Sequence, residues 1–423
     1  MCILRVFVNL GLNICGTVNA INSKSYLHRA IICSALCPEN TRILNVHNIC
    51  TDVKNTVDCV KSFSDVDFDV ENINIKSSFS KPSDKIFNCG ESGSTLRFLL
   101  PVVSALGFNA HFDCEESLKK RPIKDFIETL ELKGAVYSNN SLPFDASGKL
   151  SGGKYITSGS ISSQFISGLM FALPLLKEDS EIILTDDLQS KSYVDLTISV
   201  LNEFGIEVAK RKNGYYIKGN QRYTSPGIIN VECDWSNTAF FLALGALGGS
   251  ITVNNISKDS FQGDKQILNI LENFGADVSI VGNSVTVKKN KLKGISISIK
   301  NIPDLAPIIA VLGMFAEGET VIYDTERLKY KESNRVEAIC SNINRIGGCA
   351  ESTDNKIIVR GSSDIIGGEI NSYNDHRIVM AFSVASVLSQ SPIIIDGAEA
   401  VNKSYPSFFE DLEAIGGKIN IIE

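Results

Sequence analysis

The sequence predicts an α/β protein of two domains, each built from three repeats of a βαβαββ unit. Its 423 residues exceed what one ordinary hydrophobic core accommodates. A phrase with Leu or Ile four residues before a glycine returns at intervals of 69 to 72 residues. A sixth copy surrounds Phe63 and lacks the glycine. We expect the other five copies to end helices in a left-handed conformation at Gly134, Gly205, Gly275, Gly347 and Gly416.

One repeat shows the expected order of elements. An apolar helix over Ile302–Phe315 is followed by a strand over Thr320–Tyr323 and an amphipathic helix over Ser333–Ile346. Two short strands then follow at Cys349–Ser352 and Lys356–Arg360. Strands joined through a helix pair in parallel, whereas the closing hairpin adds an antiparallel pair.

The first helix of most repeats is apolar nearly all round. Such a helix is typical of the interior of a domain, with sheets around it. One change of domain is expected near Pro226-Gly227, where the third repeat ends. The buried helices are predicted at Phe98–Leu106, Phe165–Leu176, Thr238–Leu247, Leu305–Phe315 and Ile378–Leu388.

Composition disfavours several classes of function. The net charge of −7 at pH 7 makes a general nucleic-acid binder unexpected. Eleven cysteines without a C-x-x-C pair and four scattered histidines indicate reduced thiols and no metal site. The apolar start of the chain reads as a strand, and no apolar run reaches the roughly 18 residues of a membrane span. We therefore expect a cytoplasmic protein.

The stretch Asn88–Arg97 carries the first functional signal. Gly90 and Gly93 lie in a turn of small residues ahead of an apolar helix. Backbone N–H groups of such a turn, and the helix N-terminus itself, favour an anion. Arg97 stands in the first helical turn, where a cation opposes the helix dipole unless an anion is present. An ordinary Gly/Ser turn with a solvated arginine accounts for the stretch equally well.

Basic residues recur at the starts of other helices. Their number in an acidic protein predicts a bipartite anion site, because guanidinium groups suit phosphate and carboxylate. The sequence contains no P-loop and no G-x-G-x-x-G motif, so a nucleotide phosphate site is disfavoured. The six basic residues are Arg29, Arg97, Arg121, Arg335, Arg377 and Lys403.

Polar side chains accompany these cations. Ser25 can cap the helix that follows it, and Ser162 and Ser190 open two others. Asp304, before a very apolar helix, is either a capping residue or a desolvated general base. Taken singly, these motifs are also typical of plain helix caps.

Taken in order, the motifs resemble the 3-phosphoshikimate 1-carboxyvinyltransferase (EPSP synthase) family over essentially the whole chain. The resemblance implies a two-domain inverse α/β barrel of six repeats. It places residues 1–17 and 229–423 in one domain and residues 18–228 in the other, so the first strand joins the far half. The matching segments are Ser23-Lys24-Ser25 with Arg29, Gly90–Arg97, Lys120–Ile123, Ser162–Gln164, Lys331–Arg335 and Asn374–Arg377.

The implied reaction transfers the enolpyruvyl (1-carboxyvinyl) group of phosphoenolpyruvate to the 5-hydroxyl of shikimate 3-phosphate. It proceeds by addition and elimination through a tetrahedral intermediate, releases phosphate and belongs to the biosynthesis of chorismate and the aromatic amino acids. The resemblance further implies a monomer without metal or cofactor, whose partners are these small molecules.

The resemblance also assigns roles to residues. Asp304 is expected to accept the hydroxyl proton, while Glu332 or Lys24 protonates the methylene carbon. The residues implied for shikimate 3-phosphate are Lys24, Ser25, Arg29, Ser162, Ser163, Gln164, Ser190, Asp304 and Lys331. Those implied for phosphoenolpyruvate are Lys24, Gly93, Arg121, Gln164, Arg335, Arg377 and Lys403.

The sequence departs from the family pattern at two places. Ile21-Asn22 replaces a common Pro-Gly, and Glu91 replaces a common asparagine beside the anion site. Gly93 matches the position where the herbicide glyphosate competes with phosphoenolpyruvate. Inhibition by glyphosate is therefore expected, with its strength left open by Glu91 and Ser94.

Two alternatives were weighed against this interpretation. UDP-N-acetylglucosamine enolpyruvyl transferase shares the fold but resembles the chain less, because Glu116 stands where that family has a mobile-loop cysteine and Cys114 is out of register. A non-catalytic anion-binding module is disfavoured because Asp304, Glu332 and Lys24 are all present.

Overall fold

The structure is a computed structural model that describes residues 4–11, 13–46, 48–69, 71–78 and 84–422. Two compact units divide the chain: unit 1 comprises Met1–Ile21 with Glu232–Glu423, and unit 2 comprises Asn22–Val231. The chain changes unit after Ile21 and after Val231, whereas the sequence placed these borders at 17/18 and 228/229. That the two units fold as independent domains stays a prediction.

Unit 2 contains three four-stranded sheets in its described residues. Each sheet has one parallel pair of strands and two antiparallel pairs. In two sheets a helix connects the parallel strands, and in the third the parallel partner comes from a distant segment of the chain. The sheets are β14 (Ile228–Asn230), β3 (Thr41–Leu44), β5 (Asn72–Ser77) and β4 (Ser64–Asp69); β6 (Asp84–Asn88), β7 (Asn109–Asp113), β9 (Phe144–Gly148) and β8 (Ala135–Tyr137); and β10 (Gly153–Thr157), β11 (Ser180–Leu184), β13 (Gly214–Ile217) and β12 (Val208–Arg211).

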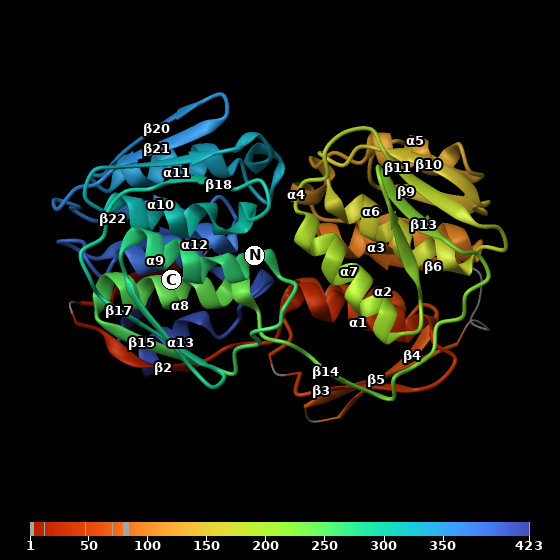
Figure 1. Ribbon diagram of the computed structural model, residues 1–423, viewed down its shortest axis with the longest axis horizontal. Helices are drawn as coiled ribbons and strands as arrows, with labels where there is room; N and C mark the ends of the chain where they lie inside the picture. Colours follow the sequence, from red (N-terminus) through yellow and green to blue (C-terminus); the bar gives the residue numbers. More distant parts are fainter. Residues whose placement is uncertain (1–3, 12, 47, 70, 79–83, 423) are drawn as a thin grey trace. The chain divides into compact units, whose positions relative to one another are not determined.

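Helices fill the interior of unit 2, as Figure 1 shows. The helix that begins at Gly93 is buried along nearly its whole length, which agrees with its apolar sequence. The helices are α1 (Lys24–Leu36), α2 (Thr51–Val60), α3 (Gly93–Leu106), α4 (Glu116–Lys119), α5 (Lys124–Glu131), α6 (Ser163–Ala172) with the 3₁₀ turn η1 (Leu173–Leu175), and α7 (Lys191–Glu203). Helix α3 packs against α6, α6 against α7, and α1 against α2 and α7.

Unit 1 repeats this plan with three further four-stranded sheets in its described residues. Two of them are completed by strands from the start of the chain. The sheets are β22 (Gly368–Asn371), β23 (Ile393–Asp396), β1 (Arg5–Asn9) and β24 (Lys418–Ile422); β16 (Asp277–Val281), β17 (Ser284–Lys288), β15 (Ser250–Asn254) and β2 (Cys15–Asn19); and β18 (Ser296–Ser298), β19 (Glu319–Tyr323), β21 (Lys356–Arg360) and β20 (Cys349–Thr353).

The first strand joins the far half of the chain, as expected. Strand β1 lies between β23 and β24 and pairs antiparallel with both. Strand β2 likewise pairs in parallel with β15, over residues 15–19 against 250–254. At the end of unit 2, β14 pairs in parallel with β3, which lies near the start of the same unit. Both changes of unit therefore fall just after the strand that completes a sheet.

Three apolar helices form the centre of unit 1. Helices α8 (Trp235–Gly248), α10 (Ala306–Met314) and α12 (His376–Ala385) contact one another, and all their residues are buried. The other helices of this unit are η2 (Gly263–Gln266), α9 (Ile267–Phe274), η3 (Pro303–Leu305), η4 (Glu326–Tyr330), α11 (Arg335–Arg345), η5 (Ala398–Lys403) and α13 (Phe408–Ala414) in the described residues.

The glycines that defined the repeat have the expected conformation. All five have positive φ angles, from 74° at Gly205 to 103° at Gly134, in the region that favours glycine. In the copy that lacks the glycine, Phe63 stands at the corresponding position and is not among the residues with a positive φ angle. The glycine-free copy thus ends its helix in a different way.

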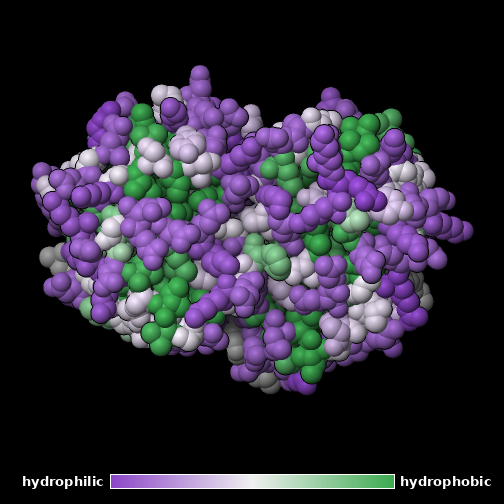
Figure 2. All heavy atoms as spheres, in the orientation of Figure 1, coloured by the Kyte–Doolittle hydropathy of each residue, from purple (hydrophilic) through white to green (hydrophobic). Residues whose placement is uncertain are grey.

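Apolar side chains on the surface are scattered. On the face drawn in Figure 2, hydrophilic side chains predominate on each unit, with smaller apolar areas among them. The most exposed large apolar residues include Leu132, Val281 and Ile86, which lie on separate elements. Among the described residues, none of the helices combines the length and apolar character that crossing a membrane requires.

Candidate active site

The start of α3 brings together several of the residues predicted in unit 2. A Cβ atom on Gly93 would lie 3.2 Å from Nη1 of both Arg97 and Arg121, and 3.5 Å from Oε1 of Gln164. The backbone at Gly93 is therefore bare and faces two guanidinium groups and an amide. This is the arrangement expected for an anion at a helix N-terminus.

Arg97, whose role the sequence left open, braces this arrangement. Its Nη1 donates to Oε1 of Gln164 at 2.6 Å, and its Nη2 donates to the carbonyl of Pro122 at 3.2 Å. The amide nitrogen of Gln164 then donates to Oγ of Ser94 at 2.9 Å. The guanidinium of Arg97 also lies 5.4 Å from the ring centre of Phe165. These contacts fix which way the Gln164 amide points.

The segment that contains Arg121 is less helical than expected. Pro122 suits the first position of a helix by its residue type, but α5 begins only at Lys124, after an irregular Ile123. Arg121 thus lies in the connection between α4 and α5. Glu91, the departure that raised doubt, accepts a hydrogen bond from Oγ of Ser117 in α4 at 2.7 Å. That bond occupies part of the acceptor capacity of the Glu91 carboxylate.

The start of α1 is capped two residues earlier than predicted. Ser23, not Ser25, is the capping residue, because its Oγ accepts the backbone N–H of Tyr26 at 3.2 Å. Lys24 is the first residue of the helix and forms an ion pair with Asp52 of α2 at 2.9 Å. Asp52 was not among the predicted residues, since an acidic residue in a first helical turn is commonplace.

Arg29 joins α1 to α7. The guanidinium of this buried side chain donates to the carbonyl of Ser25 at 2.6 Å, to Oγ1 of Thr197 at 2.8 Å and to the carbonyl of Tyr193 at 2.9 Å. Its charge is thereby held beside the starts of two helices that the sequence predicted to bind one ligand. Its position also depends on Thr197, which sequence reasoning missed.

The other three predicted serines stand at helix starts. Ser162 caps α6 by accepting the backbone N–H of Gln164 at 3.3 Å, and Ser163 is the first residue of that helix. Ser190 precedes α7 with φ 52° and ψ 43°, a left-handed conformation that is uncommon outside glycine. Residues held in such conformations cluster at ligand-binding sites.

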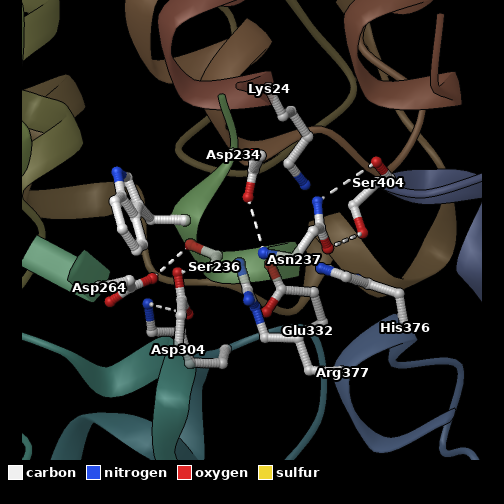
Figure 3. Close-up of polar contacts among 12 residues, drawn as sticks. Lys24, Asp234, Ser236, Asn237, Asp264, Asp304, Glu332, His376, Arg377 and Ser404 are labelled. Carbon is white, nitrogen blue, oxygen red and sulfur yellow. Dashed lines mark hydrogen bonds and ion pairs between the residues drawn. The ribbon is translucent and has the colours of Figure 1, made fainter. Parts of the chain in front are cut away.

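Unit 1 contains the second group of predicted residues, around Asp304. This carboxylate, in η3 at the start of α10, contacts three cations, of which Figure 3 labels Arg377. Its Oδ1 lies 2.7 Å from Nη1 of Arg335 and 3.3 Å from Nζ of Lys331, and its Oδ2 lies 3.3 Å from Nη2 of Arg377. The structure therefore brings together the predicted base and three predicted binding residues.

The electrostatic state of Asp304 follows from two opposed effects. Burial by itself raises the pKa of the carboxyl group, but the charges of Arg377, Lys331 and Arg335 outweigh burial. The pKa of Asp304 is held well below its ordinary 3.8, so the group is charged at neutral pH. Burial also lowers the pKa of Lys331, which Asp304 partly restores.

Arg335 is the centre of a compensated charge cluster. Its fully buried guanidinium contacts Asp304, Glu332 at 2.6 Å and Asp375 at 2.8 Å. The carboxylates outweigh burial and hold the pKa of Arg335 well above its ordinary value. The expected excess of positive charge is thus balanced by carboxylates, because a buried guanidinium without them would be too costly.

Two buried carboxylates of this unit, Asp375 and Asp264, were absent from the predicted set. Asp375 caps α12 by accepting the backbone N–H of Arg377 at 3.0 Å, and it lies inside a matched motif, which was the available signal. Asp264 in η2 is buried and accepts a short hydrogen bond from Ser236 (Figure 3). Burial and the charge of Asp304 raise the pKa of Asp264 to about 6.

Lys403 lies at the end of η5, not at the start of the last helix. Its Nζ donates to the carbonyl of Asn374 at 2.6 Å, beside the residues that precede α12. The next residue, Ser404, donates to Oδ1 of Asn237 at 3.3 Å (Figure 3). Lys403 is therefore tied to the same end of unit 1 as Arg377.

The fold and these two clusters define a class: an α/β enzyme whose helix starts suit small anionic substrates. Comparison with known proteins agrees. The EPSP synthase (3-phosphoshikimate 1-carboxyvinyltransferase) family profile matches residues 8–412. A 3-phosphoshikimate 1-carboxyvinyltransferase from Clostridium novyi is 39% identical and covers 96% of each chain. One from Brachyspira hyodysenteriae is 40% identical over 96% of this chain and 97% of its own.

Solved structures show the same fold. An EPSP synthase from Acinetobacter baumannii has a TM-score of 0.83 at 24% identity, with 99% of this chain and 100% of that chain covered. An enolpyruvyl transferase from Streptomyces tendae has a TM-score of 0.78 at 15% identity and covers 99% of both. This chain belongs to the EPSP synthase family.

Proposed function

We propose that this chain transfers the enolpyruvyl group of phosphoenolpyruvate to the 5-hydroxyl of shikimate 3-phosphate and releases phosphate. Full-length relatives at about 39% identity bear the name of that activity. The single structural observation that carries the proposal is Asp304, a buried carboxylate in contact with Lys331, Arg335 and Arg377. Such a site supplies a proton acceptor beside groups that bind anions.

The substrates divide the site residues between them. Shikimate 3-phosphate is assigned to Lys24, Ser25, Arg29, Ser162, Ser163, Gln164, Ser190, Asp304 and Lys331. Phosphoenolpyruvate is assigned to Lys24, Gly93, Arg121, Gln164, Arg335, Arg377 and Lys403. The support within unit 2 is the convergence of Arg121 and Gln164 on the bare backbone of Gly93.

Substrate binding adjusts the basicity of Asp304. Before binding, three cations depress its pKa, which makes the carboxylate a weak base. An anion bound to Arg335 and Arg377 neutralises part of their charge, so the pKa of Asp304 rises as phosphoenolpyruvate arrives. The base thereby gains strength when the substrate is in place.

The chemistry then proceeds in two stages. In the addition, the 5-oxygen bonds to C2 of phosphoenolpyruvate, Asp304 takes the hydroxyl proton, and a general acid protonates C3. In the elimination, the bond from C2 to the phosphate oxygen breaks, C3 loses a proton, and the double bond re-forms. Glu332, bonded to Arg335 at 2.6 Å, and Lys24, paired with Asp52, are the two candidate acids at C3.

The thiol chemistry of the related UDP-N-acetylglucosamine enolpyruvyl transferases has no support here. Cys114 is buried, and burial raises the pKa of its thiol to about 11. Glu116, at the position where that family has cysteine, begins α4 and pairs with Lys119 at 2.7 Å. Shikimate 3-phosphate is therefore the acceptor to test first.

The test measures phosphate release from phosphoenolpyruvate with shikimate 3-phosphate, and in parallel with UDP-N-acetylglucosamine. Turnover with shikimate 3-phosphate alone, lost in Asp304→Asn and retained in the partly exposed control Asp396→Asn, is the expected result. No release with either acceptor would refute the proposal. Loss of deuterium exchange at the methylene group in Glu332→Gln but not Lys24→Met would assign the acid to Glu332, and the reverse to Lys24.

We further propose that the enzyme acts as a monomer in the cytoplasm without a metal or cofactor. The supports are the family resemblance and the unclustered histidines of the sequence. Light scattering on the eluting peak should give a mass near 46.0 kDa, and activity should survive a chelator. A dimer mass or chelator-sensitive turnover would contradict this part.

A further inference from the structure

A chain of hydrogen bonds connects α1, α2 and α3 inside unit 2. Nδ1 of His28 lies 2.7 Å from Oγ1 of Thr56, which lies 2.6 Å from Oγ1 of Thr95. Oγ1 of Thr95 in turn donates to Oγ of Ser92 at 2.7 Å. All four residues are at most 1% exposed. This chain of hydrogen bonds therefore runs through the buried interior and ends beside Gly93.

The hydroxyl groups fix the direction of every proton in this chain. A hydroxyl has one proton to donate and two lone pairs to accept with. Thr95 donates to Ser92 at 2.7 Å, in preference to the carbonyl of Asp52 at 3.5 Å. Thr56 must then donate to Thr95, which leaves Thr56 only able to accept from His28. Nδ1 of His28 consequently carries the proton.

The surroundings of the imidazole agree with a neutral ring. Burial, followed by the nearby charges of Lys24 and Arg29, lowers the pKa of His28 well below 6.5. Nε2 is buried, and the described residues offer it no hydrogen bond. A bare nitrogen lone pair is tolerated there more readily than an N–H group without an acceptor. Nε2 is thus the unprotonated nitrogen.

We propose that His28, Thr56, Thr95 and Ser92 form a proton-ordered chain that positions the Ser92-Gly93 turn for phosphoenolpyruvate, with His28 held as the Nδ1–H tautomer. None of the four belongs to the assigned binding or catalytic set. They are positioning residues that act through Gly93, and this role rests on the proposed function. The tautomer itself does not depend on that function.

The chain has a definite end at the turn. Ser92 caps α3, and its Oγ accepts both the hydroxyl of Thr95 and the backbone N–H of Thr95 at 3.2 Å. The serine rotamer and the first turn of the helix are therefore set together. Because the backbone at Gly93 faces Arg121 and Gln164, a shift of this turn moves the anion-binding groups relative to one another.

The central link of the chain is the best place to break it. Thr56→Val keeps the shape of the side chain but removes the donor to Thr95 and the acceptor for His28. Thr56→Ser restores the hydroxyl and serves as the conservative rescue. Thr252→Val is the matched control, because it removes a Thr–Thr hydrogen bond of 2.8 Å between two strands of unit 1.

The first readout is the tautomer of His28, measured by long-range proton–nitrogen NMR on protein with labelled histidine. The His28 signal is assigned by its loss in His28→Asn. Wild-type protein and Thr56→Ser should show a protonated Nδ1 and a bare Nε2, whereas Thr56→Val should lose that pattern. A protonated Nε2 in wild-type protein would overturn the proposal, whether or not the protein turns over shikimate 3-phosphate.

The second readout is steady-state kinetics. Thr56→Val should raise the KM for phosphoenolpyruvate about tenfold, equivalent to about 1.4 kcal/mol, with kcat and the KM for shikimate 3-phosphate little changed. Thr56→Ser and Thr252→Val should behave like wild-type protein. Equal increases in both KM values, or a fall in kcat alone, would reject a positioning role at the turn. Absence of turnover in wild-type protein would instead refute the proposed function.

Discussion

The buried contact between Arg335 and Asp375 should be worth several kcal/mol, and Asp375→Asn tests it. The aspartate accepts from Nε of Arg335 at 2.8 Å and from Oγ of Ser333 at 3.0 Å through Oδ2. Through Oδ1 it accepts the backbone N–H of Arg377 at 3.0 Å and Nη2 of Arg335 at 3.3 Å. Asparagine can keep the Oδ1 bonds but presents an N–H₂ group where Oδ2 stood.

The magnitude follows from what is lost. The variant loses one charge-assisted hydrogen bond, worth about 1.5–3 kcal/mol, and places a donor against the donor of Arg335. Removing one partner of a buried ion pair costs about 3–5 kcal/mol, and Arg335 retains Asp304 and Glu332. We therefore expect a loss near the lower end, about 3 kcal/mol, or roughly 6–12 °C in Tm for a unit of this size.

Urea unfolding at neutral pH measures this loss, with Asp396→Asn as the matched control in the same unit. Asp396 pairs with Arg5 at 2.6 Å, but both side chains are about 40% exposed, so the control should shift the midpoint far less. Equal shifts in the two variants would refute the reasoning, because burial would then add nothing to the contact with Arg335. A changed slope in urea would indicate loss of two-state unfolding.

Three further predictions concern other parts of the site. Gly93→Ala should fold normally but raise the KM for phosphoenolpyruvate and weaken inhibition by glyphosate. The reason is that its methyl group would lie 3.2 Å from Nη1 of Arg121, and unchanged kinetics would contradict this expectation. The raised pKa of Asp264, about 6 against 3.8, means that its contribution to stability is full below about pH 4 and is lost as pH rises through 6. Asp264→Asn should therefore raise the urea midpoint near neutral pH and not at acid pH, and the opposite order would refute the sign. Arg97→Lys should raise the KM for both substrates, since lysine cannot hold both the Gln164 amide and the Pro122 carbonyl; a rise for one substrate alone would show that Gln164 stays oriented.

Much of the fold could be predicted because short stretches of the sequence indicate it. A glycine that must adopt positive φ marks a helix end wherever it occurs, so a period of about seventy residues is visible without any three-dimensional information. A helix that is apolar on every side is buried in the interior of a domain. The borders between the units were harder to predict from the sequence, because they depend on which sheets β2 and β14 join.

The cations of the site could be predicted from the sequence, but the acidic residues around them were harder to predict. Arg335 and Arg377 stand out in the sequence because positive charge at a helix start is unfavourable on its own. Asp264 carries no such mark, since its contact with Ser236 joins residues 28 positions apart and is set by packing alone. The cap at Ser23 was missed because Ser23 and Ser25 are equally good capping residues by type.

The compensated state of the cations changes how anion binding should be understood. A sequence with basic helix starts suggests an open positive surface, but Arg335 is buried with three carboxylates and Arg377 contacts Asp304. If phosphoenolpyruvate binds to Arg335 and Arg377 as proposed, its phosphate or carboxylate exchanges with carboxylates that already desolvate the guanidinium groups, so the cost of burying the cations has been met in the folded protein. In that proposal the same exchange releases Asp304 from the field of its cations. Binding of the anion and activation of the base are on this view one electrostatic event at Asp304, which explains why a proton acceptor is placed among three positive charges that weaken it at rest.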